Sequence, residues 1–325
     1  MKPLSRTPLL SIVVPAYNVE QFIADAIFSA LTQTMSDLEV VVVDDGSTDR
    51  TAKIIAAIRD PRLRPIRQEN RGLAGARNSG VRAARAPFVG FLDGDDLWEP
   101  NKAATQLAAF EADAHLVMTY SYSAYIDDRG VRTGEYLVSR LRRPTLRQMI
   151  RRNHVGNGST PIIRTRELRE AGLFNERLRS VEDYEMWCRL LHRHGDGAAF
   201  MVPEPATLYR VRTRSLSVNF GNFVRFGEMA NALMREAMPE IPRWVMREGL
   251  ANIYRIASRK AASAGCSREA LRYLGRALRL APWLPLSDPR VAPTLALIAT
   301  GGRAQSALHG VLRAAFIGST AAKRT

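Results

Sequence analysis

Apolar and polar residues follow a repeating order along the first hundred positions of the chain. Residues 10–15 and 38–44 are continuous apolar runs rich in valine and isoleucine, which is typical of strands buried on both faces of a parallel sheet. Between these runs, apolar pairs recur every four residues over 22–31, a spacing that predicts an amphipathic helix. Further strands and helices follow in turn, up to a strand that ends at Asp93. This alternation predicts an α/β fold with a doubly wound parallel sheet.

The pattern changes in the second half of the chain. We expect a helix that Ser180 caps and that ends at Gly195. One more apolar run follows this helix. From about residue 219, amphipathic helices follow one another without intervening strand patterns. We therefore expect two parts, a sheet-containing domain over 1–218 and a C-terminal α-helical extension over 219–325.

The chain is strongly basic, with 47 lysine and arginine residues against 32 aspartate and glutamate residues and a net charge of +15. Residues 220–325 alone carry 16 basic and 6 acidic residues. Such a charge suits nucleic acid, an anionic membrane face or a phosphorylated substrate. Because no nucleic-acid-binding motif occurs, we expect no nucleic-acid partner.

Three features bear on the location of the protein. No uncharged apolar stretch reaches about 18 residues, so no membrane-spanning helix is predicted. The N-terminal apolar run lacks a small-residue cleavage site and predicts a first strand rather than a signal peptide. The two cysteines, Cys188 and Cys266, lie far apart in helix-like segments, which argues against a disulfide framework. We expect a cytoplasmic protein.

Carboxylates directly follow two of the predicted strands. Asp44 and Asp45 come after one of them. Asp93, Asp95 and Asp96 come after another, at the sheet edge where ligands of parallel α/β folds bind. The D-x-D spacing of Asp93 and Asp95 suits a divalent cation, Mn²⁺ or Mg²⁺, that in turn binds a substrate diphosphate. The alternative is a solvated turn with capping acids.

Four other residues have both a binding and a structural interpretation. Asp45 can accept a hydrogen bond from a nucleotide base or cap the next helix. Arg77 can reach a phosphate, although the small residues around it also suit tight helix packing. Asp183, in the first turn of a helix, is either a general base or a partner of the helix dipole. Trp187, one turn later, is either a wall for a sugar or, more in keeping with its position, part of the core.

Taken in order, six segments resemble an inverting family 2 glycosyltransferase of bacterial type with the GT-A fold. The similarity extends over about residues 9–218. The segments are SIVVPAYN at 11–18, VVVDDGSTD at 41–49, QENRGLAGARNSG at 68–80, FLDGDDLWEP at 91–100, VEDYEMWCR at 181–189 and YRVRTRSLS at 209–217. The resemblance implies a Rossmann-like, mostly parallel mixed sheet flanked by helices.

The resemblance also implies a donor site for a nucleoside-diphosphate sugar. Asp45 is expected to bind the nucleotide base, with Pro15, Tyr17 and Arg77 also on the donor side. Asp93 is expected on the ribose or metal side of the donor.

The divalent cation of this family lies on the donor diphosphate, and the resemblance assigns it to Asp95 with Asp93. Arg212 stands where many relatives carry a histidine near the metal and the diphosphate. Arginine cannot ligate a metal but can pair with phosphate. We therefore expect Arg212 to bind the donor, with a weaker or different metal dependence.

The catalytic base implied by the resemblance is Asp183, which takes the proton of an acceptor hydroxyl as that hydroxyl attacks the anomeric carbon. Glu182, Trp187 and Asn157 are expected on the acceptor side. The implied function is sugar transfer to a glycan or lipid-linked acceptor in cell-surface polysaccharide or glycoconjugate biosynthesis.

Two alternatives stay open. One is a module that binds sugar nucleotides without catalysis. The other is a sugar-1-phosphate nucleotidyltransferase, but such an enzyme carries a loop of the type G-x-G-T-R after the first strand, where this chain has PAYNVEQ.

The basic extension over 219–325 lies outside the segments that carry the resemblance. It is expected either to contact anionic lipid, as a peripheral protein on the inner face of the cytoplasmic membrane, or to form a packing or oligomer contact.

Overall fold

The computed structural model of the chain describes residues 7–139, 141–211, 220–287 and 291–300. The chain divides into two units, Met1–Ser215 and Leu216–Thr325. The boundary that we predict after residue 218 falls outside the described residues and stays a prediction.

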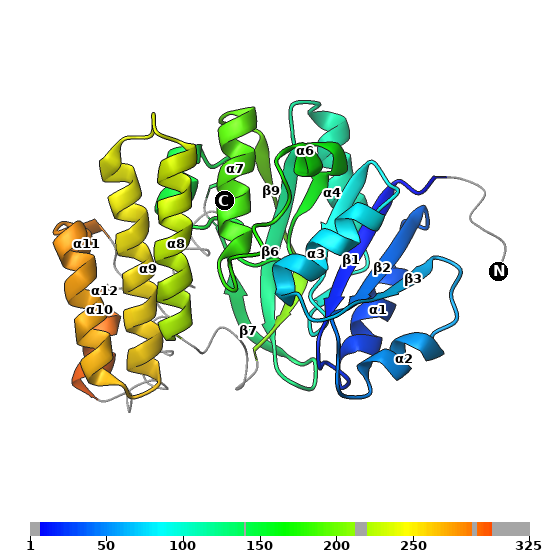
Figure 1. Ribbon diagram of the computed structural model, residues 1–325, viewed down its shortest axis with the longest axis horizontal. Coiled ribbons are helices and arrows are strands. Elements are labelled where there is room, and N and C mark those ends of the chain that lie inside the picture. Colours follow the sequence, from blue (N-terminus) through cyan, green and yellow to red (C-terminus); the bar gives the residue numbers. More distant parts are fainter. Residues whose placement is uncertain (1–6, 140, 212–219, 288–290, 301–325) are drawn as a thin grey trace, which may run out of the picture. The chain divides into compact units, whose positions relative to one another are not determined.

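A mixed sheet runs through the first unit (Figure 1). Its strands are β1 (Leu10–Ala16), β2 (Leu38–Asp44), β3 (Leu63–Arg67), β4 (Phe88–Phe91), β5 (Leu97–Trp98), β6 (Met118–Ile126), β7 (Arg132–Leu137), β8 (Ile162–Arg164) and β9 (Ala199–Arg210). They lie in the order β3-β2-β1-β4-β8-β6-β9-β5, with β7 paired to β6. The pairs β1–β2, β2–β3, β1–β4 and β6–β9 are parallel, and the pairs β4–β8, β5–β9, β6–β7 and β6–β8 are antiparallel. The expected α/β class and mixed sheet are confirmed.

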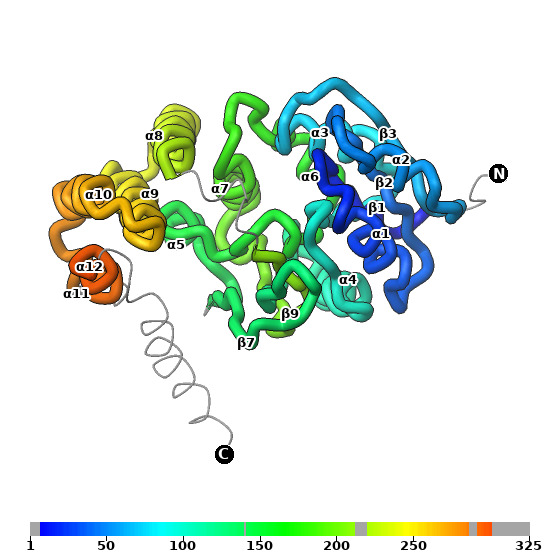
Figure 2. Tube along the Cα trace, turned by 90° about the horizontal axis from the view of Figure 1, so that it is seen from below, coloured from blue at the N-terminus to red at the C-terminus, as the bar shows by residue number. Residues whose placement is uncertain are grey.

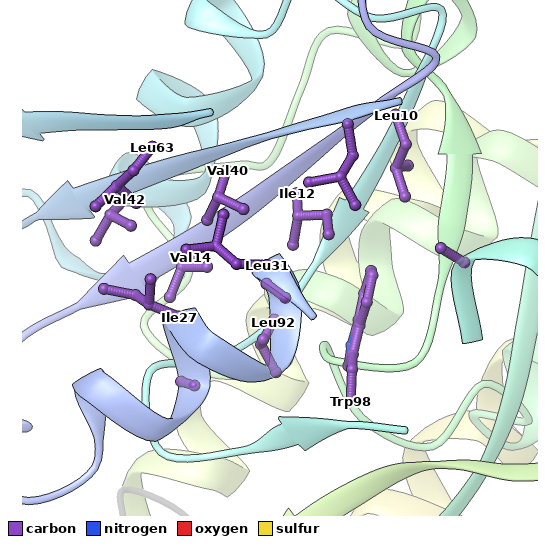
Figure 3. Packing of buried hydrophobic residues seen from close by; sticks show 14 of the residues in the cluster. Leu10, Ile12, Val14, Ile27, Leu31, Val40, Val42, Leu63, Leu92 and Trp98 are labelled. Atoms are coloured by element: carbon purple, nitrogen blue, oxygen red, sulfur yellow. The ribbon is translucent and has the colours of Figure 1, made fainter. Parts of the chain in front are cut away.

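Helices flank this sheet. They are α1 (Ile23–Leu31), α2 (Thr51–Ala57), α3 (Gly72–Ala83), α4 (Lys102–Ala112), α5 (Leu146–Arg151), α6 (Thr165–Glu170) and α7 (Glu182–His194). Every residue of β1 and β2 is buried, as their continuous apolar runs predict. Figure 3 shows side chains of β1 and β2, among them Val14 and Val40, in one cluster with Ile27 and Leu31 of α1.

Two element boundaries differ from the prediction. β4 ends at Phe91, and Asp93 lies in the turn that follows, where its carbonyl accepts from Asp96 N over 2.9 Å. Ser180 does not cap α7, because Val181 stands at the cap position with a left-handed φ of 57° and no side-chain cap bond is formed. Gly195 does end that helix, with a φ of 85°, as predicted.

The second unit is helical in its described part. Its helices are α8 (Phe220–Ala237), α9 (Arg243–Ser263), α10 (Ser267–Leu280), α11 (Leu284–Ser287) and α12 (Val291–Ala299). α9 packs against both α8 and α10 (Figure 2). Among the described residues, no helix combines the length and apolar character that crossing a bilayer requires.

The close approach of α3 to the sheet yields a stability prediction. A Cβ added at Gly80 would lie 2.3 Å from Val13 Cγ1, and Val13 sits in a fully buried strand. Gly80→Ala should therefore lower the free energy of unfolding by about 1–3 kcal/mol, measured by urea unfolding. Gly275→Ala in α10 is the control, since nothing lies within 4 Å of the added atom and alanine favours a helix by about 0.5–1 kcal/mol. A gain of stability in both variants would contradict the prediction.

Candidate active site

The carboxyl ends of β1, β2 and β4 meet at one edge of the sheet. β1 lies between β2 and β4 and runs parallel to both. The segments that follow β2 and β4 return to the end of β1, where Asp45 N donates to Ala16 O over 2.9 Å and Gly94 N donates to Pro15 O over 3.2 Å. The acids that follow the two strands therefore share this edge.

A buried arginine of α3 connects the acidic turn after β4 to the start of α7. Arg77, 2% exposed, donates from Nη2 to Asp93 Oδ1 over 2.8 Å and from Nη1 to Glu182 Oε1 over 2.7 Å. Its guanidinium lies 6.0 Å from the ring centroid of Phe91 and 5.6 Å from that of Phe174. Burial alone would lower the pKa of Arg77, but the neighbouring carboxylates, Asp93 first, raise it above its ordinary value.

This arrangement corrects two predictions. Arg77 is not directed at a donor phosphate, because it is buried and its terminal nitrogens pair with the partly exposed Asp93 and the buried Glu182. Glu182, 5% exposed, is not a free acceptor-side group, because it is one of those two partners. Sequence reasoning also missed Gly158, where an added Cβ would lie 2.1 Å from Arg77 Nη2. Only glycine leaves room there for the guanidinium.

The D-x-D turn is held by two residues that sequence reasoning did not select. Ser159 Oγ accepts from Asp93 N over 3.0 Å and donates to Asp96 Oδ2 over 2.6 Å. Arg210 donates from its backbone N to Asp96 Oδ1 over 2.9 Å and from Nε to the carbonyl of Asp95 over 2.7 Å. Asp96 is 1% exposed, and burial, reinforced by Asp95 and Asp93, raises its pKa well above the ordinary value. Asp96 is thus a structural acid of the turn.

The residues present fit a divalent cation that binds together with a ligand. Asp93 and Asp95 are both partly exposed, and carboxylate oxygens are the ligands that Mn²⁺ and Mg²⁺ favour. Within the described ranges, no group of three His, Cys, Asp or Glu residues is arranged to hold a metal. The two carboxylates would therefore need further oxygen ligands, which a diphosphate and water can supply.

The start of α7 presents Asp183 next to Glu182. Val181, at the cap position of α7, has a positive φ of 57°, a conformation that is a clear outlier for a β-branched residue. Burial, reinforced by Asp183 and Asp93 and opposed by Arg77, raises the pKa of Glu182 to about 7. Asp183 is partly exposed, and burial raises its pKa too, against the effect of Arg77. A raised pKa makes Asp183 a stronger base than its place at a helix N-terminus suggests.

Asp45 links β2 to the start of α3. Its carboxylate is 2% exposed and accepts from Gln68 Nε2 over 2.6 Å, from Arg71 N over 2.9 Å and from Gly72 N over 2.8 Å. The helix that Asp45 caps is therefore α3 and not the next helix along the chain. Asp49 contacts α2 instead, since its Oδ1 accepts from Thr51 N over 2.9 Å. Contact of Asp45 with a nucleotide base stays a prediction.

The remaining donor-side residues differ in exposure. Tyr17 is 49% exposed at the end of β1, so its ring is accessible to a ligand. Pro15 is buried in that strand and its carbonyl supports the D-x-D turn. Arg212 lies outside the described residues.

The structure corrects one of the two other acceptor-side predictions. Trp187 is 0% exposed and packs edge to face on Phe174, with 5.8 Å between ring centroids, so its ring belongs to the core. Asn157 is partly exposed, and its Nδ2 donates to Ser123 Oγ over 2.8 Å while its Oδ1 accepts from Ser159 N over 3.0 Å. Its place on the acceptor side stays a prediction.

Solved structures share this fold. TarS 1–349 of S. aureus superposes with a TM-score of 0.61 at 21% identity and covers 91% of each chain; other structures of TarS contain UDP or UDP-GlcNAc. A mannosyltransferase of Pyrobaculum calidifontis in complex with GDP-Man and Mn²⁺ superposes with a TM-score of 0.54 at 20% identity, covering 92% of this chain and 88% of that one. The first unit has the GT-A fold.

Sequence comparison gives the family. Residues 11–172 match the model of glycosyl transferase family 2. The succinoglycan biosynthesis protein ExoO of Rhizobium meliloti (strain 1021) is 36% identical over 224 residues, 66% of this chain and 64% of that protein. This chain belongs to glycosyl transferase family 2. The matched segments cover 64% of the length of ExoO and 19% of the length of a chondroitin synthase of Escherichia coli, which is 43% identical over 129 residues.

Removal of the buried guanidinium should strongly destabilise the first unit. Arg77→Met leaves Asp93 and Glu182 without their cation, and breaking a buried ion pair in this way costs about 3–5 kcal/mol, measured by urea unfolding. Arg82→Met on the same helix is the control, because Arg82 is exposed and lies 3.9 Å from Glu176, so less than about 1 kcal/mol should be lost. Adding Glu182→Gln to Arg77→Met should restore part of the stability. Equal losses in the two single variants would contradict this account.

The raised pKa of Glu182 gives a pH dependence of stability. Between pH 4.5, the ordinary value, and about 7, the folded chain retains a proton that the unfolded chain has lost. The free energy of unfolding should therefore fall as pH rises through this window. Glu182→Gln should flatten that slope, whereas Glu170→Gln, at an exposed acid whose pKa is lowered by Arg166, should not. Urea unfolding at a series of pH values measures the slope, and an unchanged slope in Glu182→Gln would refute the assignment.

Proposed function

We propose that this chain is an inverting glycosyltransferase that moves a sugar from a nucleoside-diphosphate sugar to an acceptor hydroxyl. The observation that carries the proposal is the pairing of Arg77 with both Asp93 and Glu182 at the carboxyl edge of a GT-A sheet. Glu182 is the chain neighbour of Asp183, so the two ion pairs connect the candidate base to the acidic turn. Polysaccharide biosynthesis is the setting of the relative ExoO, and we propose a glycan or lipid-linked acceptor in cell-surface polysaccharide or glycoconjugate assembly.

The donor is proposed to lie across the carboxyl ends of β1, β2 and β4. TarS binds UDP and UDP-GlcNAc, and the Pyrobaculum mannosyltransferase binds GDP-Man with Mn²⁺. In this chain, Tyr17 and Asp45 would face the base, while Asp93 and Asp95 would hold Mn²⁺ or Mg²⁺. When bound, the cation would neutralise charge on the departing diphosphate.

In the proposed reaction, Asp183 accepts the proton of the acceptor hydroxyl as that oxygen forms a bond to the anomeric carbon. The bond from this carbon to the diphosphate oxygen breaks on the opposite face, and its electron pair leaves with the nucleoside diphosphate. One displacement inverts the anomeric centre. Arg77 takes no direct part; it positions Asp93 and Glu182 through the two ion pairs.

We also propose that the chain works as a peripheral protein at the inner face of the cytoplasmic membrane, contacting anionic lipid through its second unit. The 16 basic and 6 acidic residues over 220–325 support this proposal. A donor-binding role for Arg212, and the altered metal dependence expected from it, stay predictions from the sequence.

Asp183→Asn is the test of catalysis. The variant keeps the size of the side chain but loses its basicity, so transfer should fall by at least about 100-fold. Transfer is measured with the donor that a screen of UDP- and GDP-sugars with Mn²⁺ selects, and donor binding is measured by calorimetry. Binding should change little. Asp25→Asn, at an exposed acid of α1, is the matched control and should transfer normally. If the wild-type chain binds the donor but shows no turnover, it is instead a non-catalytic binding module.

A further inference from the structure

Two tryptophans of the second unit lie largely at its surface. Trp244 is 49% exposed at the start of α9, and Trp283 is 45% exposed just after the end of α10. Their places in the fold are adjacent, because Trp283 Nε1 donates to Glu248 Oε1 over 2.9 Å and Glu248 stands one helical turn after Trp244. The two indoles therefore belong to one end of the α9–α10 pair.

Exposed arginines stand close to these tryptophans along α9 and α10. Arg243 and Arg247 flank Trp244 on α9, and Arg279 stands in the last turn of α10 near Trp283. None of the three arginines has an ion-pair partner within the part of the chain that the structure describes. We call the set Arg243, Trp244, Arg247, Arg279 and Trp283 the Trp/Arg face.

The chemistry of the Trp/Arg face fits the surface of a bilayer. An indole combines a large apolar ring with one N–H donor, and it is enriched where a membrane changes from headgroup to hydrocarbon. Free guanidinium groups beside it are drawn to the phosphates of anionic lipids. Moving such a ring from water into the headgroup layer removes apolar surface from water, which is favourable.

We propose that the Trp/Arg face docks the second unit on an anionic lipid surface. The proposal rests on the membrane association put forward above and locates it on five residues. This proposal differs from a general attraction of the basic chain to lipid. Binding would require the indole rings and the arginines of the Trp/Arg face, and net charge alone would not suffice.

Binding of the full chain to vesicles tests the proposal. Sedimentation is compared for vesicles of phosphatidylcholine with phosphatidylglycerol and for vesicles of phosphatidylcholine alone. The wild type should bind the anionic vesicles. Arg243→Glu/Arg247→Glu should weaken this binding by roughly tenfold or more, and so should Trp244→Ser/Trp283→Ser, which leaves the charge unchanged.

A second arginine pair serves as the matched control. Arg268 and Arg272 are exposed near the start of α10, toward the opposite end of that helix from Trp283. Arg268→Glu/Arg272→Glu changes the net charge by the same amount and should bind nearly as well as the wild type. Equal losses in the two arginine pairs would overturn the proposal in favour of net charge, and full binding by the tryptophan variant would overturn it as well.

Two further measurements separate other occupants of the face. If the wild type sediments as an oligomer in solution and the tryptophan variant as a monomer, the face is a contact between copies of this chain and the proposal fails. It also fails if the face variants lose binding to a single-stranded oligonucleotide rather than to vesicles. Donor hydrolysis without vesicles should be the same in all variants and the wild type, so failure of the docking proposal is distinguishable from failure of the proposed transferase activity.

Discussion

One buried guanidinium balances the charge of the acidic edge of the sheet. Arg77 is 2% exposed and pairs with both Asp93 and Glu182, so the turn after β4 and the start of α7 depend on the same cation. A charge taken out of water is costly unless its partners are well placed. The space around Arg77 meets this condition, with two aromatic rings near its guanidinium and Gly158 where any side chain would collide with it.

The helix that carries Arg77 extends this constraint to other segments. At its start, the backbone of Gly72 donates to Asp45, which ties α3 to the end of β2. One residue after Arg77, Asn78 donates to the carbonyl of Phe174 and accepts from its N–H, each over 2.9 Å. Gly80 then allows the helix to lie directly on Val13. The Gly/Ala-rich character of α3 is therefore explained by packing, and the candidate site is positioned by that packing.

The parts of the structure that the sequence predicts are those set by local pattern. The apolar runs predicted that β1 and β2 are buried and pair in parallel. The aspartates that follow two strands indicated the sheet edge where the candidate site lies. The partners of the side chains were not predictable in the same way. Arg77 and Glu182 are 105 positions apart, and nothing in the spacing of either segment shows that they meet. Ser180 looked like a cap by residue type, whereas the backbone turns at Val181.

Charge balance also connects the resting site to the proposed reaction. Asp93 and Glu182 share one guanidinium, and burial, reinforced by Asp183 and Asp93, raises the pKa of Glu182 to about 7. A divalent cation at Asp93 and Asp95, arriving alone, would lower the pKa of these carboxyls and weaken Asp183 as a base. A nucleoside-diphosphate sugar brings two negative charges, which offset the two positive charges of the cation. The donor and the cation together thus leave the net charge of the site nearly unchanged. The pKa of Asp183 can therefore stay raised while Asp183 takes the proton of the acceptor hydroxyl in the proposed reaction.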